Sequence, residues 1–243
     1  MKSKILLLAI FLFGGTAGYG QWRPVTAEEE KFVQTVEAKV NKILLATAHK
    51  MPGKWDIKIE TDQFQRHELD EGQHSGRPHE VRVRLFMDYK PTDAEMEQMD
   101  KDIFAHAEQT QNYDPIPDEL NRINPEFRWR LYASFVVNYY GFMPLSPAAI
   151  PGLGYETATP GAVYSFVQWK KMGTGAPASY IYLGHFKRIQ TKDGQEIVED
   201  FSAVANCRDV KTVIIEVQSS ERLIEKFLAL LDMDAVNALI REH

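Results

Sequence analysis

The stretch FRWRLYASFVVNYYGF, from Phe127 to Phe142, predicts a central strand of this protein. In its first half, apolar residues alternate with more polar ones. Successive side chains of a strand point to opposite faces, so one face of this half is buried. The second half carries Val136, Val137, Tyr139 and Tyr140, and is therefore apolar or aromatic on both faces. This pattern predicts a strand that runs from the margin of a sheet into the middle of the fold.

Further strands are predicted on both sides of this stretch. Residues 54–64 and 80–89 alternate between apolar and charged side chains, which favours an antiparallel pair. Asp193-Gly194 is typical of a tight hairpin turn, and the β-branched run Val210–Gln218 is typical of a central strand. Residues 162–170, 179–190 and 196–201 complete the predicted set. Most of these strands follow one another through turns, which favours antiparallel pairing.

Three helices are predicted from capping patterns and apolar spacing. Thr26 with Glu29, and Thr92 with Glu95, each form a capping box at the start of an amphipathic segment. A last helix begins after Ser219 or Ser220. The order of elements predicts an α+β fold. The predicted fold is a mainly antiparallel sheet of about six or seven strands, packed by an N-terminal helix, a middle helix and a C-terminal helix.

The N-terminus has the three-part pattern of a secretory signal peptide. Lys2 and Lys4 precede the apolar run Ile5–Phe13, and small residues follow it. The run is too short for a membrane span, which needs roughly 20 apolar residues. We expect cleavage after Gly20, and therefore export to the periplasm or the extracellular space, with no integral membrane span in the mature chain.

The mature chain, residues 21–243, is predicted to form one α+β domain. The alternative is a pair of subdomains that meet near residues 112–125, where the sequence is polar and interrupted by proline. Cys207 is the only cysteine, which excludes an internal disulfide, and we expect it to pack as a small apolar residue.

The charge of the chain argues against nucleic acid as a partner. The formal net charge is −6, and removal of Lys2 and Lys4 with the signal peptide makes it −8. Nucleic-acid-binding proteins instead carry a basic patch that meets the phosphate backbone.

A long polar segment between the first two predicted strands contains His67, His74 and His79. Imidazoles, together with neighbouring carboxylates such as that of Glu68, are suitable ligands for zinc. Their spacing matches no helical metal motif, so the favoured interpretation is a solvated polar loop. A zinc site formed by the three histidines, in a metal-dependent hydrolase with Glu68 as base, is the alternative.

A second segment, residues 141–161, is broken by four prolines and yet is rich in apolar and aromatic side chains. Proline excludes a regular helix or central strand there. The segment either covers the sheet or lines a binding surface together with strand aromatics such as Tyr164, Tyr180 and Tyr182. The predicted ligand-binding residues are Tyr139, Tyr140, Phe142, Met143, Leu145, Ile150, Leu153 and Tyr155.

The usual catalytic signatures are missing from the sequence: there is no nucleophile elbow, phosphate-binding loop or paired-cysteine motif. No catalytic residue or cofactor is therefore predicted, beyond the zinc alternative. The favoured hypothesis is an exported, soluble, non-enzymatic binding protein whose partner is a small apolar ligand or an envelope protein. A structural component of an envelope assembly is a further alternative.

Overall fold

A computed structural model describes most of the chain. The described residues are 22–23, 26–62, 66–67, 79–111, 130–138, 154–168, 177–191, 194–200 and 208–241. The predicted signal peptide, Cys207 and the predicted boundary near residues 112–125 lie outside them.

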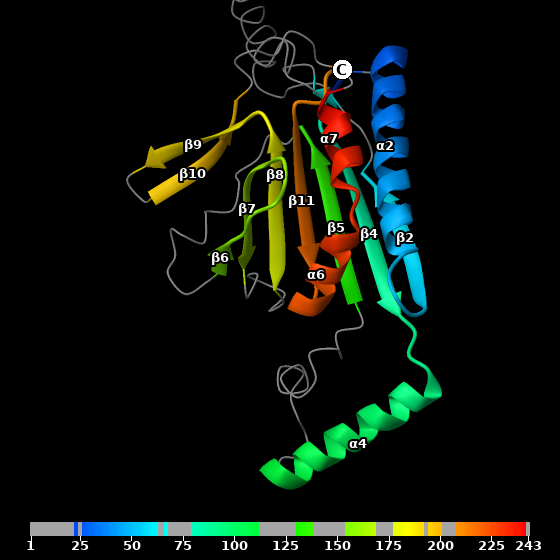
Figure 1. Ribbon diagram of the computed structural model, residues 1–243. Coiled ribbons are helices and arrows are strands. Elements are labelled where there is room, and N and C mark those ends of the chain that lie inside the picture. The colour runs from blue at the N-terminus through cyan, green and yellow to red at the C-terminus, as the bar shows by residue number, and fades with distance from the viewer. Residues whose placement is uncertain are drawn as a thin grey trace, which may run out of the picture.

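The centre of the fold is a sheet of seven strands in which every pair is antiparallel (Figure 1). Its strands are, in spatial order, β2 (Trp55–Thr61), β4 (Val81–Tyr89), β5 (Arg130–Val137), β11 (Thr212–Gln218), β8 (Ala178–Gly184), β7 (Ala162–Gln168) and β6 (Gly154–Glu156). The Phe127–Phe142 stretch supplies β5, which pairs with β4 on one side and with β11 on the other.

Two short pairs of strands stand beside the main sheet. The strands β9 (Phe186–Thr191) and β10 (Gly194–Glu199) form the hairpin predicted at Asp193-Gly194. The strands β1 (Trp22–Arg23) and β3 (Arg66–His67) pair with each other. The single strand predicted over residues 179–190 is instead two strands, because Gly184 has a φ of +94° and turns the chain between β8 and β9.

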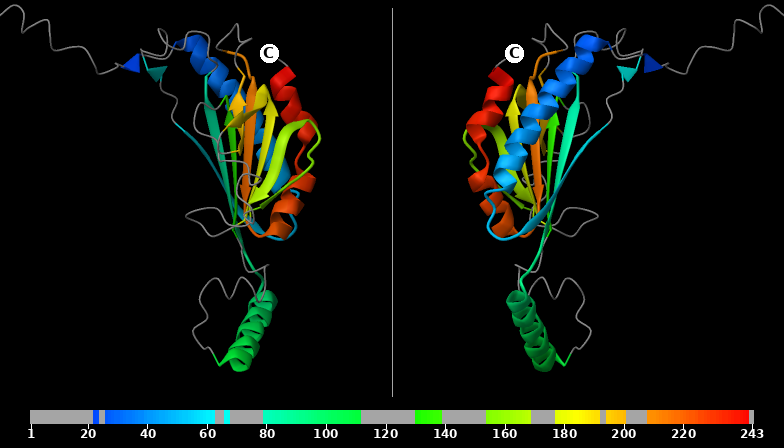
Figure 2. Two further views of the ribbon diagram at one scale, coloured as in Figure 1. Left: turned by 90° about the vertical axis from the view of Figure 1, so that its left-hand side faces the viewer. Right: turned by 90° about the vertical axis from the view of Figure 1, so that its right-hand side faces the viewer.

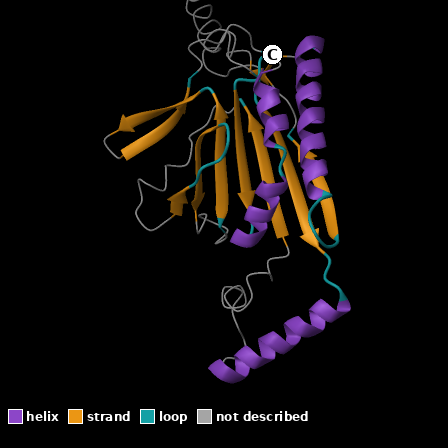
Figure 3. Ribbon diagram, in the orientation of Figure 1, coloured by secondary structure: helices purple, strands orange, loops and turns teal. Residues whose placement is uncertain are grey.

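The helices are α2 (Ala27–Ala48), α4 (Asp93–Thr110), α6 (Glu221–Leu230) and α7 (Met233–Arg241). Both predicted capping boxes are present: the Thr26 hydroxyl accepts from the Glu29 amide, and the Thr92 hydroxyl accepts from the Glu95 amide. Each box satisfies backbone amides that a helix leaves open at its start. The predicted α+β fold class is confirmed (Figure 3).

The main core lies between one face of the sheet and the helices α2, α6 and α7 (Figure 1). On α2, Val36, Val40 and Leu44 are fully buried and recur at helical spacing. They pack with inward-facing sheet residues such as Leu85 and Phe135, which are also fully buried. A side chain of this kind contributes roughly 1.5–3 kcal/mol when it is taken out of water, so this layer holds α2 and the C-terminal helices on a single face.

The middle helix α4 forms where the sequence predicts it, but it projects beyond one end of the sheet and does not lie on either face (Figures 1 and 2). Within the described parts of the chain, none of the helices combines the length and apolar character needed to cross a membrane.

Candidate functional site

The second face of the sheet, opposite α2, α6 and α7, carries a different set of side chains. Every second residue of each strand faces the helices and packs in the core with them. The residues between them therefore point to the second face. These residues are charged on β2 and β4 and aromatic on β7 and β8. The views in Figure 2 show the sheet edge-on, with α6 and α7 confined to one of its sides.

One row of residues crosses the middle of this second face. The strand registers place Arg84, Ser134, Glu216, Tyr180 and Phe166 directly opposite one another on five neighbouring strands. The row therefore passes from a cation through a hydroxyl and a carboxylate to two rings. Cross-strand neighbours of this kind lie about 4.5–5.5 Å apart at their Cβ atoms, which is close enough for side chains to interact.

Glu216 stands at the centre of the row, on the central strand β11. Its carboxylate accepts a hydrogen bond from the Tyr180 hydroxyl at 3.3 Å and another from the side-chain amide of Gln218. Glu216 is half-buried, whereas Tyr180 is only 5% exposed. Burial, followed by the nearby charge of Glu216, raises the pKa of Tyr180 well above its ordinary value of 10.0. Tyr180 therefore stays protonated and keeps its donor directed at the carboxylate.

Two accessible rings lie beside this carboxylate. Phe86 and Tyr132 are opposite each other in the next row, their ring centroids are 5.3 Å apart, and both are half-buried. Tyr132 is in turn opposite Gln218. We name this surface the aromatic–carboxylate patch. It consists of Phe86, Tyr132, Tyr180, Glu216 and Gln218.

The patch is bounded on one side by a packed aromatic cluster. Phe166 stacks on Tyr180 with ring centroids 4.9 Å apart, and Tyr182 meets Phe186 of the hairpin edge-on at 5.5 Å. Phe166 and Tyr182 are completely buried, and Ile197 of β10 belongs to the same cluster. Such ring pairs contribute about 0.5–1.5 kcal/mol beyond their burial, so this side of the patch is a rigid wall.

The other side of the patch is charged. Arg84 donates to Asp62 at 2.8 Å, and Arg82 donates to Glu80 at 3.0 Å. Asp56 at the edge strand forms an exposed ion pair with Lys90. Exposed pairs of this kind contribute little to stability, with a median of about 0–1 kcal/mol. Their effect here is to hold the arginine side chains along the margin of the patch.

Asn138 anchors one end of the sheet. Its side-chain amide donates to the carbonyls of His79 and Asp209 at 3.0 and 2.9 Å. Its side-chain oxygen accepts from the amides of Lys211 and Thr212. The residue is completely buried and has a left-handed backbone, with a φ of 55°. The ends of β4, β5 and β11 are therefore fastened together at one point.

This end of the sheet is also where both sequence-predicted functional segments join it. The histidine-containing segment rejoins the described chain at His79, and the apolar Pro/Gly segment leaves it after Asn138, which donates to the His79 carbonyl. The chain returns at Gly154, which pairs with Gln168 at the opposite end of the sheet. The C-terminal end of the histidine-containing segment and the N-terminal end of the Pro/Gly segment thus meet at Asn138.

Most of the predicted ligand-binding residues lie outside the described residues. These are Tyr139, Tyr140, Phe142, Met143, Leu145, Ile150 and Leu153. Tyr155 is described: it lies on the edge strand β6 and is 41% exposed. The strand registers align Tyr155 with Val217 of the helix-side core, so Tyr155 lies on the helix side of the sheet and not at the patch. Burial, followed by the charges of Glu221 and Glu225 on α6, raises the pKa of Tyr155. The strand aromatics Tyr164, Tyr180 and Tyr182, by contrast, gather on the second face.

The three histidines of the zinc alternative have different settings. The backbone of His67 pairs with Trp22 in the short β1–β3 ladder, and His74 lies outside the described residues. The His79 side chain is 1% exposed, with its Nε2 atom 3.2 Å from Oε1 of Glu29. In the part of the chain that the structure describes, no group of three or more His, Cys, Asp or Glu side chains is placed to hold a metal ion. The zinc site stays a prediction.

Glu216 is the residue that sequence reasoning missed. The run VKTVIIEVQ was assigned to a central strand, and its one carboxylate was given no role. The signal was present in that context, because an acidic residue is rare within an apolar strand unless another group hydrogen-bonds its carboxylate. Its partners, Tyr180 and Tyr132, are distant in sequence and could not be assigned without the strand order.

The fold and the patch together define an antiparallel α+β protein with helices on one face and an aromatic, acidic surface on the other. Comparisons of the chain with protein-family models, with curated proteins and with solved structures gave no match.

Proposed function

We propose that this chain is an exported, non-enzymatic binding protein whose ligand rests on the aromatic–carboxylate patch. The observation that carries the proposal is the position of Glu216. A half-buried carboxylate stands on the central strand beside two accessible rings, Phe86 and Tyr132, on the sheet face opposite the helices. Binding sites commonly combine such an apolar surface with a few fixed polar groups.

The chemistry of the patch specifies the kind of ligand. The rings of Phe86 and Tyr132 favour an apolar or aromatic body, and their π faces attract a cation. Glu216 accepts hydrogen bonds and carries negative charge, so it favours a ligand with an ammonium or another donor group. The rigid wall at Phe166 limits how far the ligand can extend toward β7. The ligand class is therefore a small amphiphile with an apolar body and a donor or cationic head.

The non-enzymatic part of the proposal rests on the sequence, from which the usual catalytic signatures are missing. The proposed export rests on the signal-peptide pattern of residues 1–20.

The test uses the mature chain and three probes that share one apolar body: phenylbutylamine, phenylbutanol and phenylbutanoate. Isothermal titration calorimetry should rank the amine first and the acid last, because only the amine complements the charge of Glu216. Glu216→Gln should weaken binding of the amine about tenfold, which corresponds to about 1.4 kcal/mol. The same substitution should change binding of the alcohol much less.

Asp56→Asn is the matched control, because Asp56 is an exposed carboxylate of the same sheet but lies on the edge strand, where it pairs with Lys90. It should leave the ranking of the three probes unchanged. Failure of all three probes to bind the wild-type protein, or equal loss of amine binding in the Asp56→Asn and Glu216→Gln variants, would refute the proposed site.

A further inference from the structure

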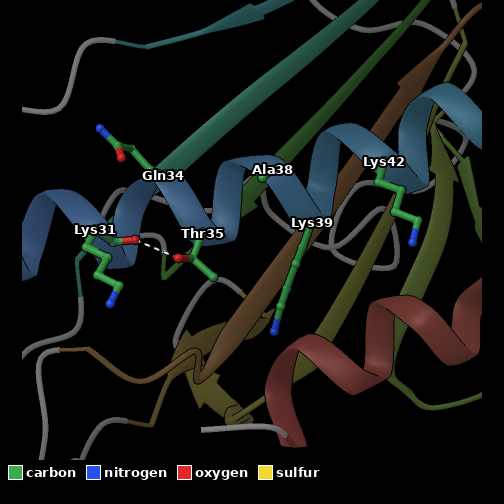
Figure 4. A pocket seen from close by; sticks show the side chains of 6 residues that line it. All are labelled: Lys31, Gln34, Thr35, Ala38, Lys39 and Lys42. Atoms are coloured by element: carbon green, nitrogen blue, oxygen red, sulfur yellow. Dashed lines mark hydrogen bonds between the residues drawn. The ribbon is translucent and has the colours of Figure 1, made fainter.

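Helix α2 has a shallow groove on its solvent-facing side, with a volume of about 460 Å³. The described residues that line it are neutral or basic: Lys31, Gln34, Thr35, Ala38, Lys39 and Lys42. Figure 4 shows the ammonium groups of the three lysines projecting from the same side of the helix. Thr35 donates its hydroxyl to the Lys31 carbonyl at 2.7 Å, which satisfies that hydroxyl within the helix. The described lining of the groove is therefore basic, with the small side chains of Thr35 and Ala38 between the lysines.

Helix α4 carries the opposite charge. Its 18 residues include six carboxylates and a single lysine. Asp93, Glu97, Asp100, Phe104 and Glu108 are all exposed and recur at helical spacing, so they form one stripe along the helix. Phe104 is 67% exposed. Its ring is therefore an accessible apolar group with carboxylates on either side of it along the stripe. The helix also projects away from the sheet, so this stripe can reach another molecule (Figures 1 and 2).

The acidic stripe and the basic groove match in spacing. Glu97 and Glu108 are eleven residues apart, as are Lys42 and Lys31, and both intervals span about 16 Å at a rise of 1.5 Å per residue. When the two helices run antiparallel, Glu97 faces Lys42 and Glu108 faces Lys31. The same alignment brings Asp100 to Lys39 and lays Phe104 over Thr35.

We propose that α4 of one molecule packs against the α2 groove of a second copy of this chain. Opposite charges meet at both ends of the contact, and Phe104 lies over Thr35 between them. A buried aromatic ring surrounded by polar pairs is a common arrangement of residues that dominate an interface. Two copies that exchange α4 reciprocally use both surfaces of each chain, and this gives a closed dimer.

A charge-swap experiment tests the contact on the mature chain by analytical ultracentrifugation. The wild-type protein should sediment as a dimer. Lys31→Glu with Lys42→Glu should give monomers, because acidic α4 then meets an acidic groove. Glu97→Lys with Glu108→Lys should also give monomers, because each new lysine then faces a lysine of the groove. An equimolar mixture of the two double variants should restore the dimer, since each then offers the charge that the other needs.

Controls separate the contact from a general loss of structure. All the substituted residues are exposed, so circular dichroism should match the wild type. Lys50→Glu reverses an exposed lysine just beyond the end of α2, outside the groove, and should leave the dimer intact. Phe104→Ser should weaken the dimer about tenfold or more without changing any charge. Raising the salt concentration from about 0.1 M to about 1 M shortens the screening length from about 10 Å to about 3 Å and should also weaken it.

Three results would overturn the proposal: a wild-type protein that is monomeric at every concentration, double variants that keep the wild-type mass, or a mixture of the two double variants that remains monomeric.

Discussion

Asn138 is the residue whose replacement tests the architecture most severely. Its side chain makes four hydrogen bonds to backbone groups of residues 79, 209, 211 and 212, in a position with no exposure to solvent. Asn138→Ala removes all four and leaves two carbonyls and two amides without the partners that they have in the native protein.

The expected loss of stability follows from these contacts. Each hydrogen bond contributes about 1 kcal/mol net, so the four together amount to about 4 kcal/mol. Alanine must also adopt the left-handed backbone that Asn138 has at a φ of 55°, which costs about 1 kcal/mol more. Asn138→Ala should therefore lower the free energy of unfolding by about 5 kcal/mol, a large part of the 5–15 kcal/mol that holds a typical domain.

Two further variants separate the contribution of the hydrogen bonds to this loss of stability from that of the left-handed backbone. Asn138→Gly loses the same hydrogen bonds but adopts a left-handed backbone at no steric cost, so it should be about 1 kcal/mol more stable than Asn138→Ala. Asn138→Asp keeps oxygens that accept from the amides of Lys211 and Thr212, but it cannot donate to the carbonyls of His79 and Asp209.

Urea denaturation followed by circular dichroism measures all of these variants against the wild type, with equal slopes required for comparison. A value for Asn138→Ala within about 1 kcal/mol of the wild type would refute the reasoning, because buried backbone groups cannot lose four partners at so little cost.

Two more predictions concern the backbone at Gly184 and the pKa of Tyr180. Gly184 has a φ of +94°, and an added Cβ would lie 2.1 Å from the Lys211 carbonyl oxygen. Gly184→Ala should thus cost about 2–4 kcal/mol in urea denaturation. Gly161→Ala, where the added Cβ meets only the Asn237 side chain at a φ of +79°, should cost less, and the reverse order would contradict this account. For Tyr180, the raised pKa means that the folded protein holds its proton more tightly than the unfolded chain does. The stabilisation is complete below the unfolded pKa of about 10 and is lost as the pH rises through the folded pKa. The free energy of unfolding should therefore fall more steeply above about pH 10 for the wild type than for Tyr180→Phe, and parallel curves would exclude this role of Tyr180.

The sequence predicts the local elements of this fold well, because their causes are local. The alternation around Leu131 and Phe135 and the capping residues Thr26 and Thr92 act within a few positions of themselves. They identify the central strand and the starts of two helices. The break at Gly184 was missed because a glycine within an apolar run does not reveal its own φ.

The candidate site was harder to predict because its parts come together only through long-range pairing. Strand β11 is the last strand in the chain, yet it lies between β5 and β8 and so places Glu216 between Ser134 and Tyr180. No spacing in the sequence encodes that neighbourhood. The position of α4 shows the same limit, since an amphipathic pattern indicates an apolar side but not the surface that it meets.

The most direct test of the central claim is a map of where the amine probe binds. Backbone amide chemical shifts of the isotope-labelled mature protein should be recorded as phenylbutylamine is added. The largest changes should fall at Phe86, Tyr132, Tyr180 and Glu216, on strands β4, β5, β8 and β11. These changes should shrink in the Glu216→Gln variant. Changes confined to α2, α6 and α7, with the patch residues unaffected, would contradict it.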